Sequence, residues 1–329
     1  MPASSATASF HRYGLCLLTT VIVSACVAEL PQESPVPTPP ASGTGPSDDP
    51  NAGGGEKPTP PSNPPATAGL RIGLWISPWE LNKRTPQQYI RSLRGLTRAS
   101  SYSNRPLLIL SLCGATAANR AACQFQPPPN LPQYANIDYG QDLITPFMDA
   151  IEAEGDIDVI LLIEPMAAHV SELTRVVMTK YGNYKAVKGL APDWEWVRGD
   201  GDKASKIAGW IAELAQYKAN MEYHMIGWEL NVFGATRDAT MTFGYDGQGF
   251  ANLEQQLNYF RNWHSGFAPN RSGVYWGYSM DASWMRPLVN SPQALKQLQD
   301  RYRDLNPNGM ILLATEQLYF DIEPMLQTL

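Results

Sequence analysis

Acidic residues lie at or within a few residues of the ends of most of the short apolar runs of this 329-residue sequence, often beside tryptophan or tyrosine. They are found in the stretches Trp79-Glu80, Glu164, Asp193-Trp194-Glu195-Trp196, Trp228-Glu229, Tyr245-Asp246, Asp281 and Glu316. Two carboxyl groups can supply an acid together with a base or a nucleophile, which is what cleavage of a glycosidic bond requires. Aromatic rings offer flat apolar surfaces to the C–H faces of sugars. As a set, these residues predict hydrolysis of a glycosidic bond in a polysaccharide, with a polysaccharide or oligosaccharide as the partner, although each acid alone could be a solvated loop residue or a helix cap.

The segment 188–196, Lys-Gly-Leu-Ala-Pro-Asp-Trp-Glu-Trp, is the densest part of this set. Asp193 and Glu195 are two positions apart, so on an extended strand their side chains point to the same side. Repulsion from Asp193 raises the proton affinity of Glu195, as a general acid needs. We therefore expect Glu195 to be the general acid and Asp193 its tuning and orienting partner.

This segment resembles the end of the fourth strand in the family 18 chitinases and their relatives, Asp-Gly-x-Asp-x-Asp-Trp-Glu-Tyr. The match consists of Gly189, Asp193, Trp194 and Glu195, with Trp196 at the closing aromatic position. The resemblance implies a barrel glycosidase in which Glu195 is the acid and Asp193 its partner.

Two further stretches resemble the same family. Residues 107–114 are similar to its Ser-x-Gly-Gly strand, and residues 241–246 are similar to its Met-x-Tyr-Asp strand with one extra residue. Lys188 and Ala191 replace the first two acids of the family motif, and Cys113 stands where the family has glycine. The resemblance therefore supports a barrel glycosidase more than it supports chitin as the substrate.

The C-terminal half also resembles a group of uncharacterised bacterial barrels, in which Asp-x-Glu-Trp is followed by Asp-x-Gln-x-Phe. The corresponding residues are 193–196 and 246–250, and residues 277–284 then read Gly-Tyr-x-x-Asp-x-x-Trp. This second resemblance implies a barrel but no substrate.

The second carboxylate, or the group that stabilises the transition state, is predicted among Glu229, Asp246 and Asp281. Further residues are predicted to bind the substrate: Trp79, Glu164, Trp194, Trp228, Tyr245, Gln248, Trp276, Tyr278, Trp284 and Glu316. For each tryptophan the alternative is burial in the core, because tryptophan is largely buried in most proteins.

Eight short apolar runs precede these residues, at 72–76, 107–112, 159–163, 186–190, 223–230, 241–245, 274–278 and 310–314. Runs of this length suit strands that are buried on both faces of a parallel sheet. Helical periodicity lies between most of them, and the alternation predicts an α/β fold, a (β/α)8 TIM-type barrel. The gap between the fifth and sixth runs has no room for a full helix, so the barrel is expected to be irregular there. An open doubly wound sheet is the alternative, but no Gly-x-Gly-x-x-Gly follows the first run.

The N-terminus predicts export. An apolar run at 13–23 is too short to span a membrane and ends in Val-Ser-Ala-Cys26, which resembles a bacterial lipoprotein signal with Cys26 as the lipidated residue. An ordinary secretory signal is the alternative. Residues 1–25 are then the signal peptide, residues 26–69 a Pro- and Gly-rich disordered linker, and residues 70–329 the barrel domain. The expected location is the cell envelope, at the outer membrane or cell surface, with the lipid as the only membrane contact.

Cys113 and Cys123 are expected to form a disulfide in an oxidising compartment, with two free thiols or half a metal site as alternatives. No metal site is expected, since His169, His224 and His264 fit no zinc spacing. No cofactor is expected either. A net charge of −6 without a basic run argues against nucleic acid as a partner.

Two rival functions remain compatible with the same barrel. Because Lys188 and Ala191 replace motif acids, the protein could be a catalytically inactive carbohydrate-binding or surface-assembly lipoprotein. It could also be a muramidase that cleaves peptidoglycan. Fold alone does not distinguish them, since barrels carry many functions.

Overall fold

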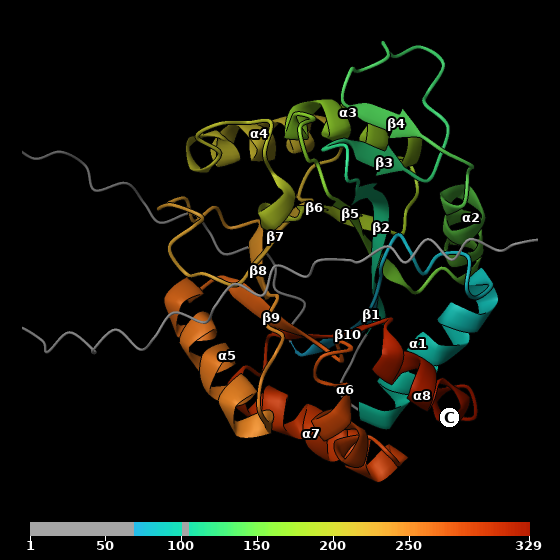
Figure 1. The fold of residues 1–329 in the computed structure, drawn as a ribbon, viewed down its shortest axis with the longest axis vertical. Helices are drawn as coiled ribbons and strands as arrows, with labels where there is room; N and C mark the ends of the chain where they lie inside the picture. Colours follow the sequence, from blue (N-terminus) through green and yellow to red (C-terminus); the bar gives the residue numbers. More distant parts are fainter. Residues whose placement is uncertain (1–68, 101–104) are drawn as a thin grey trace, which may run out of the picture. The chain divides into compact units, whose positions relative to one another are not determined.

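The structure of the protein is a computed structural model that describes residues 69–100 and 105–329. In this part, eight parallel strands close into a barrel with helices on its outside, the (β/α)8 fold that the sequence predicts (Figure 1). The strands of the barrel, in the order in which they pair around it, are β1 (Arg71–Ile76), β2 (Leu107–Ala115), β5 (Asp158–Ile163), β6 (Val187–Pro192), β7 (Glu222–Gly227), β8 (Met241–Tyr245), β9 (Arg271–Trp276) and β10 (Met310–Ala314). Pairing of β1 with both β2 and β10 closes the ring and rules out the open sheet.

Eight α-helices are found among the described residues: α1 (Pro86–Ser100), α2 (Ile144–Glu154), α3 (Val170–Tyr181), α4 (Ile207–Tyr217), α5 (Leu253–Phe267), α6 (Ala282–Met285), α7 (Pro292–Leu305) and α8 (Gln317–Leu326). Residues 228–240, between β7 and β8, contain none, which confirms the predicted irregularity. Local signals in the sequence fix some of the helix starts. At α7, the Ser291 hydroxyl accepts the N–H of Ala294 at 3.2 Å, and Pro292 occupies the first turn.

A short extension of the sheet, which the sequence analysis missed, follows β2. Strand β3 (Ala121–Cys123) pairs antiparallel with β2, and β4 (Ile137–Tyr139) pairs with β3. Cys113 and Cys123 are direct partners in the β2–β3 ladder and form a disulfide, as predicted. The bond ties this extension to the end of a barrel strand.

Alternation along the strands separates two cores. Ile72, Leu74 and Ile76 of β1 pack in the layer between the barrel and its helices, whereas Trp75 packs inside the barrel. Successive residues of a strand point to opposite faces. The residue two positions after the last inward-facing residue of a strand therefore lies at the mouth formed by the C-terminal ends, and in several strands that residue is acidic.

Charged residues close the opposite, N-terminal end of the barrel. The Arg71 guanidinium lies 2.6 Å from the Glu222 carboxylate and 3.6 Å from that of Asp158. Arg105 pairs with Asp158 at 2.9 Å. This end of a barrel generally serves stability, whereas catalytic residues lie at the C-terminal ends of the strands.

The expected signal peptide (residues 1–25), the lipidation site Cys26 and the linker up to residue 68 lie outside the described residues. Within residues 69–100 and 105–329, no helix has both the length and the apolar composition needed to cross a membrane.

Candidate active site

Three buried carboxylates and one exposed carboxylate meet at the C-terminal mouth of the barrel: Glu164, Asp193, Asp246 and Glu195. We call these four residues the carboxylate cluster. Burial raises the pKa of Asp193, and the negative charges of Asp246, Glu164 and Glu195 add to this shift.

Backbone hydrogen bonds to the neighbouring strand position the three buried acids. The N–H of Glu164 donates to the carbonyl oxygen of Cys113 at 3.0 Å, and the N–H of Asp193 donates to that of Ile163 at 3.0 Å. The N–H of Asp246 donates to the carbonyl oxygen of Gly227, also at 3.0 Å. Each acid therefore continues the ladder of the strand before it, so the closed sheet decides how the carboxyl groups converge.

Glu164 is the buried acid at the end of β5. Its side chain is 7% exposed, and one carboxylate oxygen, Oε2, accepts the N–H of Ala115 at 2.5 Å. Burial raises the pKa of Glu164 to about 7, and the charges of Glu195 and Asp246 act in the same direction, against the hydrogen bond from Ala115. At neutral pH this group is thus poised between its acid and its base form.

Asp193 and Glu195 are arranged differently from the sequence-based expectation. Residues Trp194–Trp196 form one turn of 3₁₀ helix rather than extended strand, and Asp193 caps it by accepting the N–H of Glu195 at 3.1 Å. The expectation that the two side chains point to the same side of an extended strand was therefore wrong, because the strand ends at Pro192. Asp193 nevertheless holds the backbone of Glu195, so an orienting contact between the two residues is present.

Glu195 has the one exposed side chain of the cluster. Partial burial of its carboxyl group raises its pKa, and the positive charges of Arg198 and Lys203 oppose this shift. Lys203 is held in place by donating to the carbonyl oxygen of Trp194 at 2.6 Å. The raised pKa agrees in direction with the prediction for a general acid, but burial is its main cause.

Asp246 lies at the end of β8 and is buried. The hydroxyl of Tyr278 donates a hydrogen bond to its Oδ1. Burial raises the pKa of Asp246 to about 6, and the charges of Glu195 and Glu316 add to the shift, while the bond from Tyr278 opposes it. Tyr278 therefore favours the ionised form of Asp246.

A polar layer beneath the cluster was not predicted. His224 bonds through Nδ1 to the Thr242 hydroxyl at 2.6 Å and through Nε2 to the Tyr275 hydroxyl at 2.9 Å. Burial lowers the pKa of His224 to about 3, so its ring is neutral. On the other side, the indole N–H of Trp75 donates to the Ser111 hydroxyl at 2.9 Å. All these residues face inward by the alternation of their strands, which is the signal that could have found them.

Three other predicted acids lie outside the cluster. Glu229 is exposed in the loop after β7, without a hydrogen bond or ion pair among the described residues. Asp281 is fully buried, and its Oδ1 accepts the N–H of Phe250 at 2.9 Å, so it fixes the loop that follows Asp246. Glu316 accepts the N–H of Ser279 at 2.7 Å and joins the loops after β9 and β10.

The predicted aromatic platforms divide into two groups. Trp79 and Trp228 are exposed at the mouth. Trp194, Trp276 and Tyr245 are buried in the layer between barrel and helices. A side chain enclosed in this outer layer cannot offer a face to a ligand at the mouth.

The two remaining predicted residues, Trp284 and Gln248, differ in their exposure. Trp284 is partly buried against the same outer layer, and its indole N–H lies 3.3 Å from the Asp281 carboxylate. Gln248 is exposed on the loop that follows Asp246.

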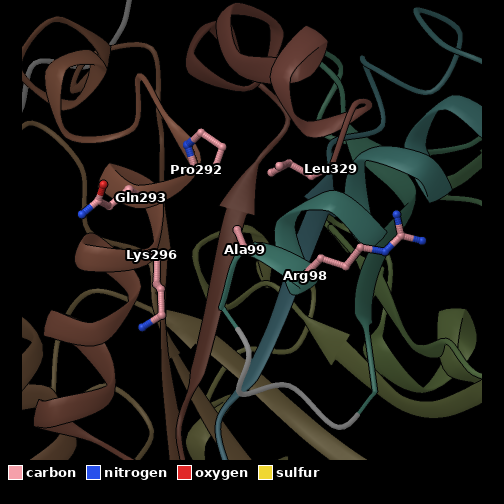
Figure 2. Close-up of a pocket in the computed structure, with 6 residues that line it drawn as sticks. All are labelled: Arg98, Ala99, Pro292, Gln293, Lys296 and Leu329. Atoms are coloured by element: carbon pink, nitrogen blue, oxygen red, sulfur yellow. The ribbon is translucent and has the colours of Figure 1, made fainter.

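A shallow pocket of about 420 Å³ lies away from this cluster, between α1, α7 and the C-terminal residue (Figure 2). Its lining residues are Arg98, Ala99, Pro292, Gln293, Lys296 and Leu329. None of them carries a carboxylate side chain, so the pocket offers no chemistry of the kind found at the mouth. In the part of the chain that the structure describes, no group of three or more His, Cys, Asp or Glu side chains could hold a metal ion.

Replacing Glu164 with glutamine is expected to stabilise the protein at high pH. The folded state binds the Glu164 proton more tightly than the unfolded state, so wild-type stability falls as the pH rises from about 4 through about 7. Glutamine removes this loss and keeps an oxygen for Ala115. We expect the free energy of unfolding to increase by up to about 3 kcal/mol at pH 8 and to change little at pH 4, in urea titrations.

The control for this experiment is Glu254→Gln, at an exposed position in the first turn of α5. Because that variant removes an exposed ion pair with Arg301, it should lower stability by at most about 1 kcal/mol and should not raise it at pH 8. An equal stability change in Glu164→Gln at pH 4 and pH 8 would show that ionisation of Glu164 does not destabilise the folded state.

No family model matches the sequence, and no curated protein matches it. Similar solved structures include a 4-O-α-L-rhamnosyl-β-D-glucuronidase from Fusarium oxysporum (10% identity, 78% of this chain and 67% of that chain, TM-score 0.46). An α-L-fucosidase from Bacteroides thetaiotaomicron is similar over 79% of this chain and 70% of its own (10% identity, TM-score 0.41). A 7,8-dihydropteroate synthase from Vibrio fischeri is similar over 79% and 92% (11% identity, TM-score 0.39). These neighbours catalyse different reactions, so the function of this chain has to be argued from its own residues.

Proposed function

We propose that this protein is a glycoside hydrolase that cleaves a polysaccharide at the C-terminal mouth of its barrel. The observation that carries the proposal is the convergence of Glu164, Asp193, Glu195 and Asp246 at that mouth. Three of these carboxyl groups are buried, and desolvation, with a smaller contribution from neighbouring negative charges, raises their pKa values. Acids tuned in this way are typical of glycosidases, which need one protonated and one ionised carboxyl group.

In this reaction Glu195 donates a proton to the glycosidic oxygen as the bond between that oxygen and the anomeric carbon breaks. Its exposure makes it the member of the cluster that a substrate at the mouth can reach. Asp246, which Tyr278 holds by a hydrogen bond, stabilises the positive charge that develops on the sugar. Water supplies the hydroxyl group of the new reducing end, and its other proton goes to a carboxylate of the cluster.

The test is a panel of polysaccharides incubated with the purified protein, with new reducing ends as the readout. The panel contains β-glucan, xylan, galactomannan, glycol chitin, polygalacturonate and peptidoglycan sacculi. Release from one polymer that disappears in Glu195→Gln would support the proposal, and release from sacculi alone would identify a muramidase. Binding to a polymer without any release would instead favour the inactive carbohydrate-binding protein.

We also propose that the protein is exported and held in the cell envelope by a lipid on Cys26. The short apolar run that ends in Val-Ser-Ala-Cys26 supports this proposal, as does the proline-rich stretch that follows it. Wild-type protein is expected in the detergent phase of a Triton X-114 extraction of the producing bacterium. Cys26→Ser should move it to the aqueous phase, and a variant that stays in the detergent phase would exclude this anchor.

A further inference from the structure

Two strongly exposed tryptophans stand at the mouth of the barrel. Trp79 follows β1 and is 56% exposed, and Trp228 follows β7 and is 47% exposed. The order of the strands places β1 and β7 on opposite sides of the barrel, four strands apart in either direction (Figure 1). The two tryptophans therefore follow strands on opposite sides of the mouth: Trp228 lies next to the strands that carry Asp193 and Asp246, and Trp79 lies across the barrel from them.

Both tryptophans are connected to the backbone of the cluster, Trp79 through space and Trp228 along the chain. A Cβ atom added to Gly114 would lie 3.2 Å from the Trp79 ring, and the next residue, Ala115, donates its N–H to Glu164. On the other side, Trp228 directly follows Gly227, whose carbonyl oxygen accepts the N–H of Asp246. Trp79 is thus close in space, and Trp228 adjacent in sequence, to a backbone group that positions one of the buried acids.

Exposed indoles beside a candidate carbohydrate site offer flat apolar faces on which sugar rings can stack. Single exposed apolar side chains are ordinary, but apolar surface around a candidate site marks binding. A sugar ring that stacks on Trp79 and another that stacks on Trp228 belong to one ligand only if its chain passes over the carboxylates between them. A short saccharide bound on one side would leave the other indole in water.

We propose that Trp79 and Trp228 stack against sugar rings on the two sides of the bond that is cut, so that the substrate is a long glycan chain cleaved at internal positions. This inference rests on the proposed function, because it uses the same carboxylate cluster. It adds the length of the substrate and the position of the cut. Internal cleavage requires a site that is occupied on both sides of the scissile bond, and the opposite placement of the two tryptophans provides it.

The test combines viscometry with reducing-end release on the polymer that the panel identifies. Internal cleavage lowers the viscosity early, when few reducing ends have formed. Trp79→Ala and Trp228→Ala should each lower kcat/KM on the polymer about tenfold, the size of one aromatic stacking contact. Tyr217→Ala is the matched control, since Tyr217 is 38% exposed at the far end of α4 and should leave the rate within about twofold.

Viscosity that falls only in proportion to reducing ends would overturn the proposal, as would tryptophan variants that behave like Tyr217→Ala. If no polymer is hydrolysed, the same variants are run through native gels that contain each polymer. Retardation of the wild type that weakens in both tryptophan variants would uphold a chain bound across the mouth while the hydrolase function fails. Retardation that depends on one tryptophan alone would overturn it.

Discussion

Replacing Glu195 with glutamine is expected to lower kcat about 10²- to 10⁴-fold, the contribution of a positioned general acid. Glutamine has nearly the same shape but no proton that it can give to the glycosidic oxygen. Because the Glu195 side chain is exposed and its backbone N–H, not its carboxyl group, bonds to Asp193, the fold should be unaffected. The measurement is release of reducing ends at saturating substrate, together with circular dichroism and a thermal melt.

The pH profile gives a second readout of the same variant. The pKa of Glu195 is raised, so the wild-type rate should fall with rising pH as this carboxyl group loses its proton. The rate of Glu195→Gln should be low at every pH and should not show this fall with rising pH. Glu254→Gln, an exposed substitution on α5, controls for the change of charge. A Glu195→Gln variant with wild-type kcat would remove Glu195 from the mechanism.

The second large effect is expected for Asp246→Asn, with a loss of about 10²- to 10³-fold in kcat, because a preorganised charge at the developing cation disappears. Asparagine keeps an oxygen that can accept the hydroxyl of Tyr278, so the geometry is retained. Removal of the negative charge also removes repulsion between Asp246 and Asp193. The pKa of Asp193 is raised mainly by burial and next by the charge of Asp246. The variant should therefore be at least as stable as the wild type at pH 8, although it is nearly inactive.

Two controls make this prediction specific. Asp304→Asn, at an exposed position near the end of α7, should change neither activity nor stability. Tyr278→Phe removes the hydrogen bond that favours ionised Asp246, so it should shift the pH dependence of the rate upward with a smaller loss of kcat. An Asp246→Asn variant that is active, or one that is inactive because it unfolds, would contradict the assigned role.

Much of the fold can be predicted from the sequence because its signals are local. Most residues of the barrel strands are apolar, since such a strand is buried on both faces, and each of the eight predicted runs overlaps a barrel strand, although the runs 223–230 and 274–278 extend past the ends of β7 and β9. The absence of a helix between β7 and β8 follows from the length of the gap alone. The acids at the mouth are also visible, because they follow the strand ends: Glu164, Asp193 and Asp246 directly continue β5, β6 and β8.

The sequence-based predictions failed where the orientation of a side chain depends on the backbone conformation after the end of a strand. Asp193 and Glu195 are two residues apart, but the strand ends before them, and the 3₁₀ turn changes their relation. Trp194 lies in this turn and packs into the outer layer, with its ring centroid 5.1 Å from that of Phe233. A spacing of two residues carries information about direction only while the chain remains extended.

The sequence by itself determined the barrel, the disulfide partners and the set of acids at the strand ends. Only the tertiary structure decided which acids converge and which side chains face them. Tyr278 reaches Asp246 across 32 residues, and His224 reaches Tyr275 across 51. Such pairs depend on which strands become neighbours when the sheet closes and on their register. Closure therefore turns separate acids into one cluster, in which shared burial and repulsion set the pKa values on which the proposed chemistry depends.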